Sequence, residues 1–363
     1  MKRFGLALVV SLASTGAMAQ SSVTIYGMVD TAVRYISYKG NGSATTLGSF
    51  GNTPSLLGFQ GTEDLGGGLS ALFHLETSFV PGTGQSPVTA FGMPFFNRGA
   101  WVGVKNDLGT LHLGRDWNPL YSNNWPFDPT GNLGVADSLH IQNLPSKGVV
   151  PNYIWNANAV TYFTPPSLGG IYGMFQASPR GDGKGCSGNV TCTTTIGSFV
   201  GGRIGYANGP FEIAVAVGQT GITSNTIVGA STGKWTQANL GINYDLKIMK
   251  VSLWVNANRF ISSYEHIAKI ALTVPFGIDY AFANAGVART NTAAQQAGLY
   301  GAHAFGIGYV HPLSKRTNLY TAASYLKNSG RGTLSVEDVG SFTGATMPGR
   351  STVGVEFGIS HKF

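Results

Sequence analysis

The feature that most constrains this chain is a two-residue alternation of apolar and polar side chains, which recurs in short segments along its length. In Ser351–Phe363, the clearest case, Val353, Val355, Phe357 and Ile359 alternate with Thr352, Gly354, Glu356, Gly358, Ser360 and Lys362. A period of two is the repeat of a β-strand, so each such segment is expected to have one apolar and one polar face.

Sixteen segments of this kind are expected, and the connections between them alternate between short and long. The expected strands are Val23–Ser37, Ser55–Glu63, Leu69–Ser78, Arg98–Val104, Thr110–Gly114, Asn158–Thr164, Ile171–Ser178, Phe199–Tyr206, Phe211–Thr220, Trp235–Tyr244, Val251–Phe260, His266–Val274, Ile278–Ala283, Tyr300–His311, Thr317–Asn328 and Ser351–Phe363. Alternating short and long connections are typical of an antiparallel up-and-down β-barrel that crosses a membrane. A barrel of about sixteen strands leaves an aqueous lumen, and in lipid the sheet must close because open edges would leave unpaired backbone groups.

The composition favours a transmembrane β-barrel over a secreted soluble β-protein. Charged residues make up 11% of the chain, and 52 of its 363 residues are Gly. Ordinary soluble domains carry about 25% charged residues. The net charge of +7 is spread along the chain and forms no basic stripe, so nucleic-acid binding is not expected.

The N-terminal residues are expected to form a cleaved export signal. Lys2 and Arg3 precede an apolar run over Phe4–Ala13, and Ala17-Met18-Ala19 provides small residues for cleavage. The run is too short for a membrane anchor, which needs about 20 residues. We therefore expect residues 1–19 to be removed and residues 20–363 to form a single barrel domain.

The third long loop, roughly Arg115–Tyr153, departs from the alternation and is expected to fold back into the barrel. It contains Trp117, Tyr121, Trp125 and Phe127, which is too aromatic a set for a free tail. Long loops without secondary structure of their own are usually functional or disordered. The sequence therefore predicts a loop that narrows the enclosed space.

Several charged side chains fall on polar strand faces and are expected to line the lumen. Lipid-facing Arg costs about 2–4 kcal/mol at mid-bilayer, so arginines at membrane depth should point inward. Arg34, Arg98 and Arg115 are expected in the lumen, whereas Arg203 and Arg259 fit the lumen and the membrane rim equally well. The polar faces also carry Asp30, His74, Glu76 and Glu212, which either line the pore or pair with arginines at its mouth.

The sequence gives no indication of catalysis, of a cofactor or of a metal site. It contains no G-x-S-x-G and no H-E-x-x-H motif, and its seven histidines are scattered. Cys186 and Cys192 are its two cysteines, and an exported chain is expected to join them in a surface-loop disulfide. An enzyme is not expected.

Four segments resemble the general porins of Gram-negative bacteria, in the type found in β-proteobacteria. They are SSVTIYGMVDTAV at Ser21–Val33, GFQGTEDLGGGLSALFHLE at Gly58–Glu76, FFNRGAWVGVKNDLGTLHLGRD at Phe95–Asp116 and LSKRTNLYTAASY at Leu313–Tyr325. The resemblance implies a trimer of sixteen-stranded outer-membrane barrels, each a passive diffusion pore for small hydrophilic solutes. It also implies contact with outer-membrane lipid and lipopolysaccharide. The terminal Phe363 resembles the signal that the barrel-assembly machinery recognises in this family.

The resemblance further implies an electrostatic constriction, in which acids of the third loop face a ladder of wall arginines. By position the loop acids of this chain are Asp116, Asp128 and Asp137. The chain departs from the family pattern at Leu56 or Gln60 and around Ile154-Trp155, where family members often carry a basic residue. This departure predicts a thinner arginine ladder.

Two other functions remain open from the sequence. A substrate-specific channel would show a continuous track of aromatic and charged side chains, which the aromatic residues of the third loop could begin. A structural or adhesive outer-membrane barrel would also suit the surface loops, but it would not need the third loop inside the barrel.

Overall fold

A computed structural model describes residues 22–86, 93–143, 153–179, 197–224, 231–336 and 346–363. Within these residues, 17 strands form one antiparallel sheet: β1 Ser22–Tyr38, β2 Ser43–Ser49, β3 Leu56–Gly66, β4 Leu69–Ser78, β5 Gly99–Asn106, β6 Gly109–Trp117, β7 Trp155–Phe163, β8 Ile171–Ser178, β9 Phe199–Asn208, β10 Phe211–Ser224, β11 Ser231–Asp245, β12 Lys250–Phe260, β13 Ser263–Phe276, β14 Asp279–Thr290, β15 Ala302–Pro312, β16 Thr317–Asn328 and β17 Ser351–Lys362. The short helices are α2 Pro119–Ser122, η1 Trp125–Phe127, η2 Ser138–Ile141 and α3 Thr292–Gln296.

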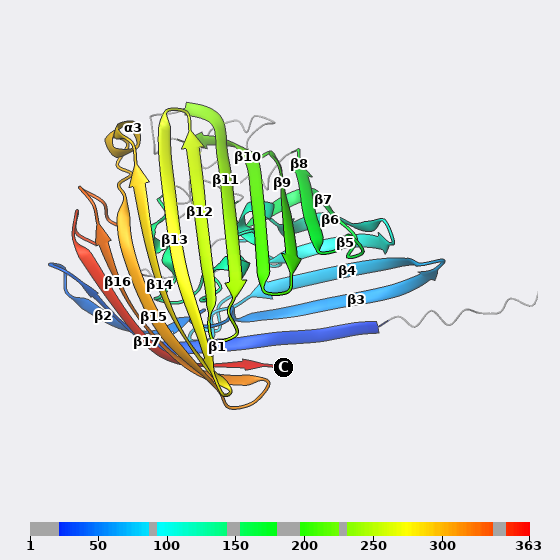
Figure 1. Ribbon diagram of the computed structural model, residues 1–363, viewed down its shortest axis with the longest axis horizontal. Helices are drawn as coiled ribbons and strands as arrows, with labels where there is room; N and C mark the ends of the chain where they lie inside the picture. Colours follow the sequence, from blue (N-terminus) through cyan, green and yellow to red (C-terminus); the bar gives the residue numbers. More distant parts are fainter. Residues whose placement is uncertain (1–21, 87–92, 144–152, 180–196, 225–230, 337–345) are drawn as a thin grey trace, which may run out of the picture.

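The sheet closes into a barrel because the last strand pairs with the first (Figure 1). The β1–β17 register runs from Met28 opposite Lys362 to Tyr38 opposite Thr352. Phe363 extends this seam, since its backbone N–H donates to the Gly27 carbonyl at 3.0 Å and Gly27 donates back at 3.2 Å. Among the described strands no edge is left unpaired, which is the condition for a sheet in lipid.

The barrel wall is sixteen strands around although 17 strands are present, because β2 and β3 pair with successive parts of the same edge of β1 and together take the place of one strand. β2 pairs with Thr31–Ser37, and β3 pairs with Ser22–Met28. The interruption between them wraps around Asp30, whose carboxylate accepts backbone N–H groups from residues 51, 52 and 53 at 2.7–3.2 Å. The predicted sixteen-stranded antiparallel barrel is confirmed, but the loop predicted over Tyr38–Pro54 contains this extra strand.

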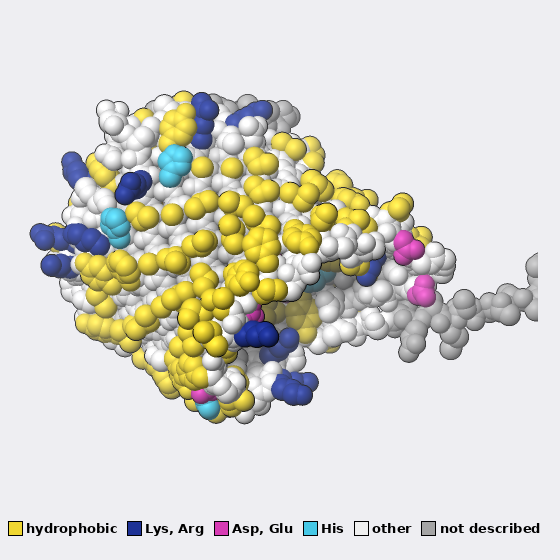
Figure 2. Space-filling model, viewed as in Figure 1, with side chains coloured by type: hydrophobic (Ala, Val, Ile, Leu, Met, Phe, Trp, Pro, Cys, Tyr) yellow, Lys and Arg dark blue, Asp and Glu magenta, His cyan; other side chains and the backbone are white. Residues whose placement is uncertain are grey.

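The predicted alternation of inward and outward side chains is observed along the strands. On β17, Val353, Val355, Phe357 and Ile359 are exposed on the outer wall, and Thr352, Gly354, Glu356 and Gly358 are buried on the inner side. Hydrophobic side chains form a broad band over the outer face of the front strands (Figure 2). This band matches the apolar belt of a membrane barrel.

Most predicted strand boundaries lie within a few residues of those observed, and the largest error concerns β14. Its expected range, Ile278–Ala283, stops seven residues short of Thr290, because Gly and Ala residues weaken the alternation over its second half. The short helix α3 then occupies part of the predicted loop.

Of the described helices, none is long and apolar enough to cross a membrane. The predicted export signal and the Cys186–Cys192 disulfide lie outside the described residues.

The short turns lie at one end of the barrel and the longer connections at the other. Residues 67–68, 107–108, 209–210 and 277–278 make tight turns at the short end. In outer-membrane barrels short turns face the periplasm and long loops face the cell exterior.

Candidate functional site

The described parts of the segment between β6 and β7, residues 118–143 and 153–154, lie inside the barrel (Figure 1). Two of its short helices begin at side-chain caps: Asn118 accepts the Leu120 N–H at 2.9 Å, and Asp137 accepts the Leu139 N–H at 2.8 Å. The loop contacts the inner wall from β8 to β17 at a series of anchors. Each anchor is made by side chains on inward-facing strand positions.

The first anchor joins α2 to the middle of the barrel wall. Asn123 donates through Nδ2 to the Ala214 carbonyl at 3.1 Å and to Asn239 Oδ1 at 2.7 Å. Arg203 on β9 donates through Nε to Asn123 Oδ1 at 2.8 Å. Asn239 Nδ2 returns a bond to the Leu120 carbonyl at 3.0 Å. The amide side chains thus satisfy loop backbone that enters the barrel without a sheet partner.

The second anchor is a buried ion pair between Asp128 of the loop and Lys269 of β13. Lys269 Nζ lies 2.8 Å from Asp128 Oδ2 and donates to Asn124 Oδ1 at 3.0 Å, and the side chains are 3% and 1% exposed. The Asp128 carboxylate also accepts bonds from Thr130 and from Ser138 Oγ. Burial raises the pKa of Asp128, but the Lys269 charge and these hydrogen bonds outweigh it and hold the pKa below its usual value.

The third anchor lies at the β1–β17 seam. Arg34 donates through Nε and Nη2 to Glu356 Oε2 at 2.9 and 2.7 Å, and the salt bridge is fully buried. The other oxygen, Oε1, accepts the Val135 N–H of the loop at 3.0 Å. Gly134 has φ +70°, and a Cβ there would overlap Glu356 and the Gly51 backbone. Only glycine fits this close approach without a shift of the loop or the wall.

The fourth anchor holds the end of the described loop segment. Asn143 donates through its backbone N and its Nδ2 to Glu265 Oε1 at 2.8 and 3.0 Å. The loop is therefore bound along one side of the barrel, on β9 to β17. The wall formed by β3 to β7 stands opposite.

The opposite wall carries arginines and aromatic rings. Arg98 donates through Nε to Glu76 Oε1 at 2.7 Å, and Tyr26 OH donates to Glu76 Oε2 at 2.7 Å. The Arg98 guanidinium lies 5.3 Å from the ring centre of Trp117 and 5.5 Å from that of Trp155. Arg115 lies 5.8 Å from the Trp155 ring and donates to the Asn97 carbonyl at 2.7 Å.

A cavity of about 110 Å³ separates the loop from this wall. Arg98, Asn97 and Trp155 line it from the wall side, and Tyr121, Trp125 and Asn132 line it from the loop. Trp125 is 41% exposed, so its ring is open to solvent rather than packed in a core.

The residues predicted for the lumen are thus brought into two separate groups. Arg98, Arg115, Asp116 and Glu76 lie on the wall opposite the loop, where Asp116 bonds His112 at 2.8 Å. Arg34, Asp30, Asp128 and Asp137 lie in buried contacts between the loop, the seam and the wall behind it. Arg203, open from the sequence, faces inward, whereas Arg259 is exposed and stacks 5.3 Å from the outer Tyr264 ring.

Sequence reasoning missed Lys269, Glu265 and Asn239, which hold the loop. Lys269 stands in SYEHIAKIALTVPF, where apolar residues fill both strand faces and hide the alternation. Parity with the inward Glu265 would have placed Lys269 in the lumen, since residues i and i+4 of a strand share a face.

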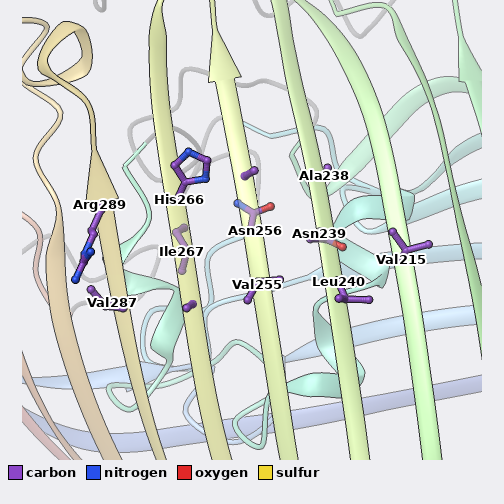
Figure 3. Close-up of a pocket in the computed structure, with 12 residues that line it drawn as sticks. Val215, Ala238, Asn239, Leu240, Val255, Asn256, His266, Ile267, Val287 and Arg289 are labelled. Carbon is purple, nitrogen blue, oxygen red and sulfur yellow. The ribbon is translucent and has the colours of Figure 1, made fainter.

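The outer wall has a second notable feature at the extracellular end of β11 to β16. Lys234, Arg259, His266, Arg289, His303 and Lys327, here called the basic belt, are all exposed. Below His266 and Arg289 an open groove of about 550 Å³ runs over Ala238, Ala257 and Ala268 (Figure 3). At the height of the basic belt, no described acidic side chain lies on the outer face of β11 to β16. Glu265, which is next to His266 in the sequence, is buried and points inward.

Comparison with known proteins gives consistent relatives over the whole chain. A family model described as Gram-negative porin matches residues 5–331. Outer membrane porin protein 32 of Delftia acidovorans is 33% identical, with all of both chains covered, and an outer membrane porin of Bordetella pertussis is 28% identical over 90% of this chain and 95% of its own. The solved structure of an anion-selective porin from Comamonas acidovorans superposes with a TM-score of 0.80 at 28% identity, covering 95% of this chain and 100% of that one.

Proposed function

This chain belongs to the Gram-negative porin family, and from that premise we propose that it is a passive diffusion channel for small hydrophilic solutes and ions. Its fold and family make it an outer-membrane channel protein rather than an enzyme. The observation that carries the proposal is the third loop, which is bound to the inner wall on β9 to β17. A loop held there narrows a barrel of this size on one side and leaves the Arg98 wall facing it.

The proposed mechanism is electrostatic sieving at the constriction between loop and wall. The arginines of the wall attract the negative end of a polar solute, and the carboxylates of the loop and seam attract the positive end more weakly, because ion pairs and hydrogen bonds already occupy their oxygens. Solutes that lose hydration in the constriction and gain no attraction to its charged side chains pass slowly, because selectivity follows the size of the pore and the charges that line it. The loop acids at Asp128 and Asp137 act mainly by holding the loop in place.

We propose a weak preference for anions. Among the inward acids, Asp30, Glu76, Asp116, Asp128, Asp137, Glu265 and Glu356 are at most 7% exposed, and Glu212 is partly exposed but bonded to Tyr172 and Asn243. Arg115 and Arg203 are partly exposed as well. Buried carboxylates with bonded oxygens act on passing ions less than an accessible guanidinium does. The similar Comamonas porin is itself described as anion-selective.

Recording from single channels in planar bilayers tests both proposals. We expect ohmic current steps that grow with KCl concentration, and a reversal potential that shifts toward cations in Arg115→Gln. Absence of conductance steps from pure protein would refute the channel. An unchanged reversal potential would place Arg115 off the ion path.

The assembly proposed for this chain is a homotrimer, inserted by the barrel-assembly machinery after removal of residues 1–19. OmpT, an outer membrane protein of Vibrio cholerae with the same fold at 12% identity, has been solved in a trimer form. The Phe363 backbone bonds to Gly27 support a role in closing the seam, because these bonds join the two ends of the barrel. The expected disulfide between Cys186 and Cys192 would then staple a surface loop.

The lipid partner proposed for the outer wall is lipopolysaccharide, bound at the basic belt. His266 and Arg289 are register partners on β13 and β14, and both line the groove, so they can donate to a phosphate at its upper end (Figure 3). The alanine-lined groove below them accepts an acyl chain. Arg289→Gln should lower the lipopolysaccharide that copurifies with the protein, and Lys315→Gln on the opposite turn should not. Equal amounts in both variants would refute the site.

A further inference from the structure

Aromatic rings form two groups on the inner wall of the barrel, one at the third loop and one nearer the periplasmic end, and the two together are here called the track. The upper part of the track lies where β6 and β7 meet the loop. Trp117 stacks on Tyr121 with ring centres 5.7 Å apart, and it lies 5.3 Å from both Trp125 and Trp155. All four rings line the 110 Å³ cavity, and two of them, Trp117 and Trp155, lie 5.3 and 5.5 Å from the Arg98 guanidinium.

The lower part of the track lies nearer the periplasm on the same strands. Trp101 on β5 stacks on His112 of β6 at 3.5 Å and on His74 of β4 at 5.3 Å, with interplanar angles of 10° in both pairs. Phe163, at the periplasmic end of β7, lies 4.8 Å from His112. By strand parity these side chains face the lumen.

Glu76 joins the two parts. It lies 2.7 Å from Arg98 above and 4.0 Å from His74 below. Aromatic side chains that only filled space would be buried, but Trp125 is 41% exposed, and Trp117, Trp155, Trp101, His74 and His112 are all partly exposed.

The charge in the cavity determines which solute the track suits. Among the described residues, Arg98 has one hydrogen-bond acceptor for its side chain, Glu76, and this bond uses only Nε. Its two Nη groups, in a side chain only 8% exposed, remain for a ligand in the cavity. A guanidinium fork binds a carboxylate in bidentate fashion, and indole faces stack on flat rings.

We propose that the track is a binding path for small planar aromatic carboxylates, held with the ring on the indoles and the carboxylate at Arg98. Sugars are less suited to it, because they would not use the Nη donors as a carboxylate does. At about 110 Å³ the cavity is smaller than an engineered apolar cavity of about 150 Å³ that binds benzene, so it takes part of an aromatic ring, and the rest of the ring lies against the solvent-exposed Trp125. This inference rests on the proposed channel, whose solute class it specifies.

The test compares sodium benzoate with sodium cyclohexanecarboxylate in planar bilayers containing the full-length protein. The two anions have the same charge and nearly the same size, and only benzoate is flat and aromatic. We expect benzoate to reduce the single-channel KCl current with saturation and cyclohexanecarboxylate to do so at least about fivefold more weakly, the worth of one stacked ring. Benzyl alcohol, a neutral ring, should block more weakly than benzoate.

Variants locate the binding path. Trp155→Leu should weaken the benzoate block about fivefold through loss of one ring. Arg98→Gln should abolish the difference between benzoate and benzyl alcohol. Phe305→Leu, on the lipid face, is the matched control and should change nothing. Where these variants do not assemble, Trp155→Phe and Arg98→Lys serve the same comparison, with smaller losses expected.

Equal block by benzoate and cyclohexanecarboxylate in the wild-type channel would overturn the proposal, and this result needs no variant. Benzoate block that is unaffected by changes at Trp155 and Arg98 would also overturn it. In both cases an intact ohmic KCl conductance would leave the diffusion channel standing. Failure of the protein to conduct KCl at all would refute the channel itself.

Discussion

The ion pair between Asp128 and Lys269 should decide whether the third loop stays inside the barrel. In Asp128→Asn the loop keeps its shape, but Lys269 is left as a buried ammonium with Asn124 Oδ1 at 3.0 Å and the Trp254 ring at 4.7 Å as its remaining contacts. Removing one partner of a buried pair costs about 3–5 kcal/mol. Because Asn124 and Trp254 compensate in part, we expect a loss of about 3 kcal/mol, the low end of that range.

A loss of that size raises the population of the released loop roughly 100-fold, since each 1.4 kcal/mol is a factor of ten. Chymotrypsin reports this population by cleavage after Phe127, which is 1% exposed while the loop is docked. Cleavage of a transiently open state follows its equilibrium population when opening and closing are fast. Asp128→Asn should therefore be cleaved after Phe127 about 100-fold faster than wild type, with mass spectrometry identifying the site.

A double-mutant cycle separates the charge effect from packing. Lys269→Met should cost less than Asp128→Asn, because Asp128 keeps its bonds from Thr130 and Ser138. Asp128→Asn combined with Lys269→Met removes both charges and should recover most of the protection. Asp107→Asn on an exposed periplasmic turn is the control. Strictly additive effects, or unchanged cleavage in Asp128→Asn, would refute the role of this pair.

Three further results are expected. Gly241→Val should displace the loop, because a Cβ at Gly241 would overlap the Phe127 ring. Losing the burial of that ring costs about 1.5–3 kcal/mol, and we expect the loosened loop to increase the open-channel noise. Unaltered noise would contradict the docking of Phe127 against Gly241. Burial, with a contribution from Arg34, lowers the pKa of His140 to about 3, so this ring is neutral in the docked loop. Docking should be full above about pH 6.5 and weaken by up to about 1.4 kcal/mol per unit as the pH falls toward 3. His140→Gln should flatten the pH dependence of open-channel noise over this range, and an unchanged pH dependence would contradict the role of His140. Phe363→Ala should lower the yield of assembled protein, because the Phe363 ring packs over Gly27 at the seam, and a normal yield would argue against that contact.

The strands were predictable because alternation is a local property of the chain. Leu69–Ser78, Ile171–Ser178 and Thr317–Asn328 were predicted with the observed bounds. β2 was missed because its pairing depends on a contact outside its own segment: the N–H groups that follow it bind Asp30 and turn the chain. The inward path of the third loop was predictable from its aromatic residues.

By itself the sequence determined which strand faces meet lipid and water, how many strands the barrel wall has around it and which loop enters the barrel. Each of these follows from a period of two and from connection lengths, which are read along the chain. Only the tertiary structure decided which acid meets which base. Arg34 and Glu356 are 322 residues apart, and Asp128 and Lys269 are 141 apart. Alternation assigns a side chain to the lumen but not to a height or a partner, and only closure of the barrel and docking of the loop bring such residues together.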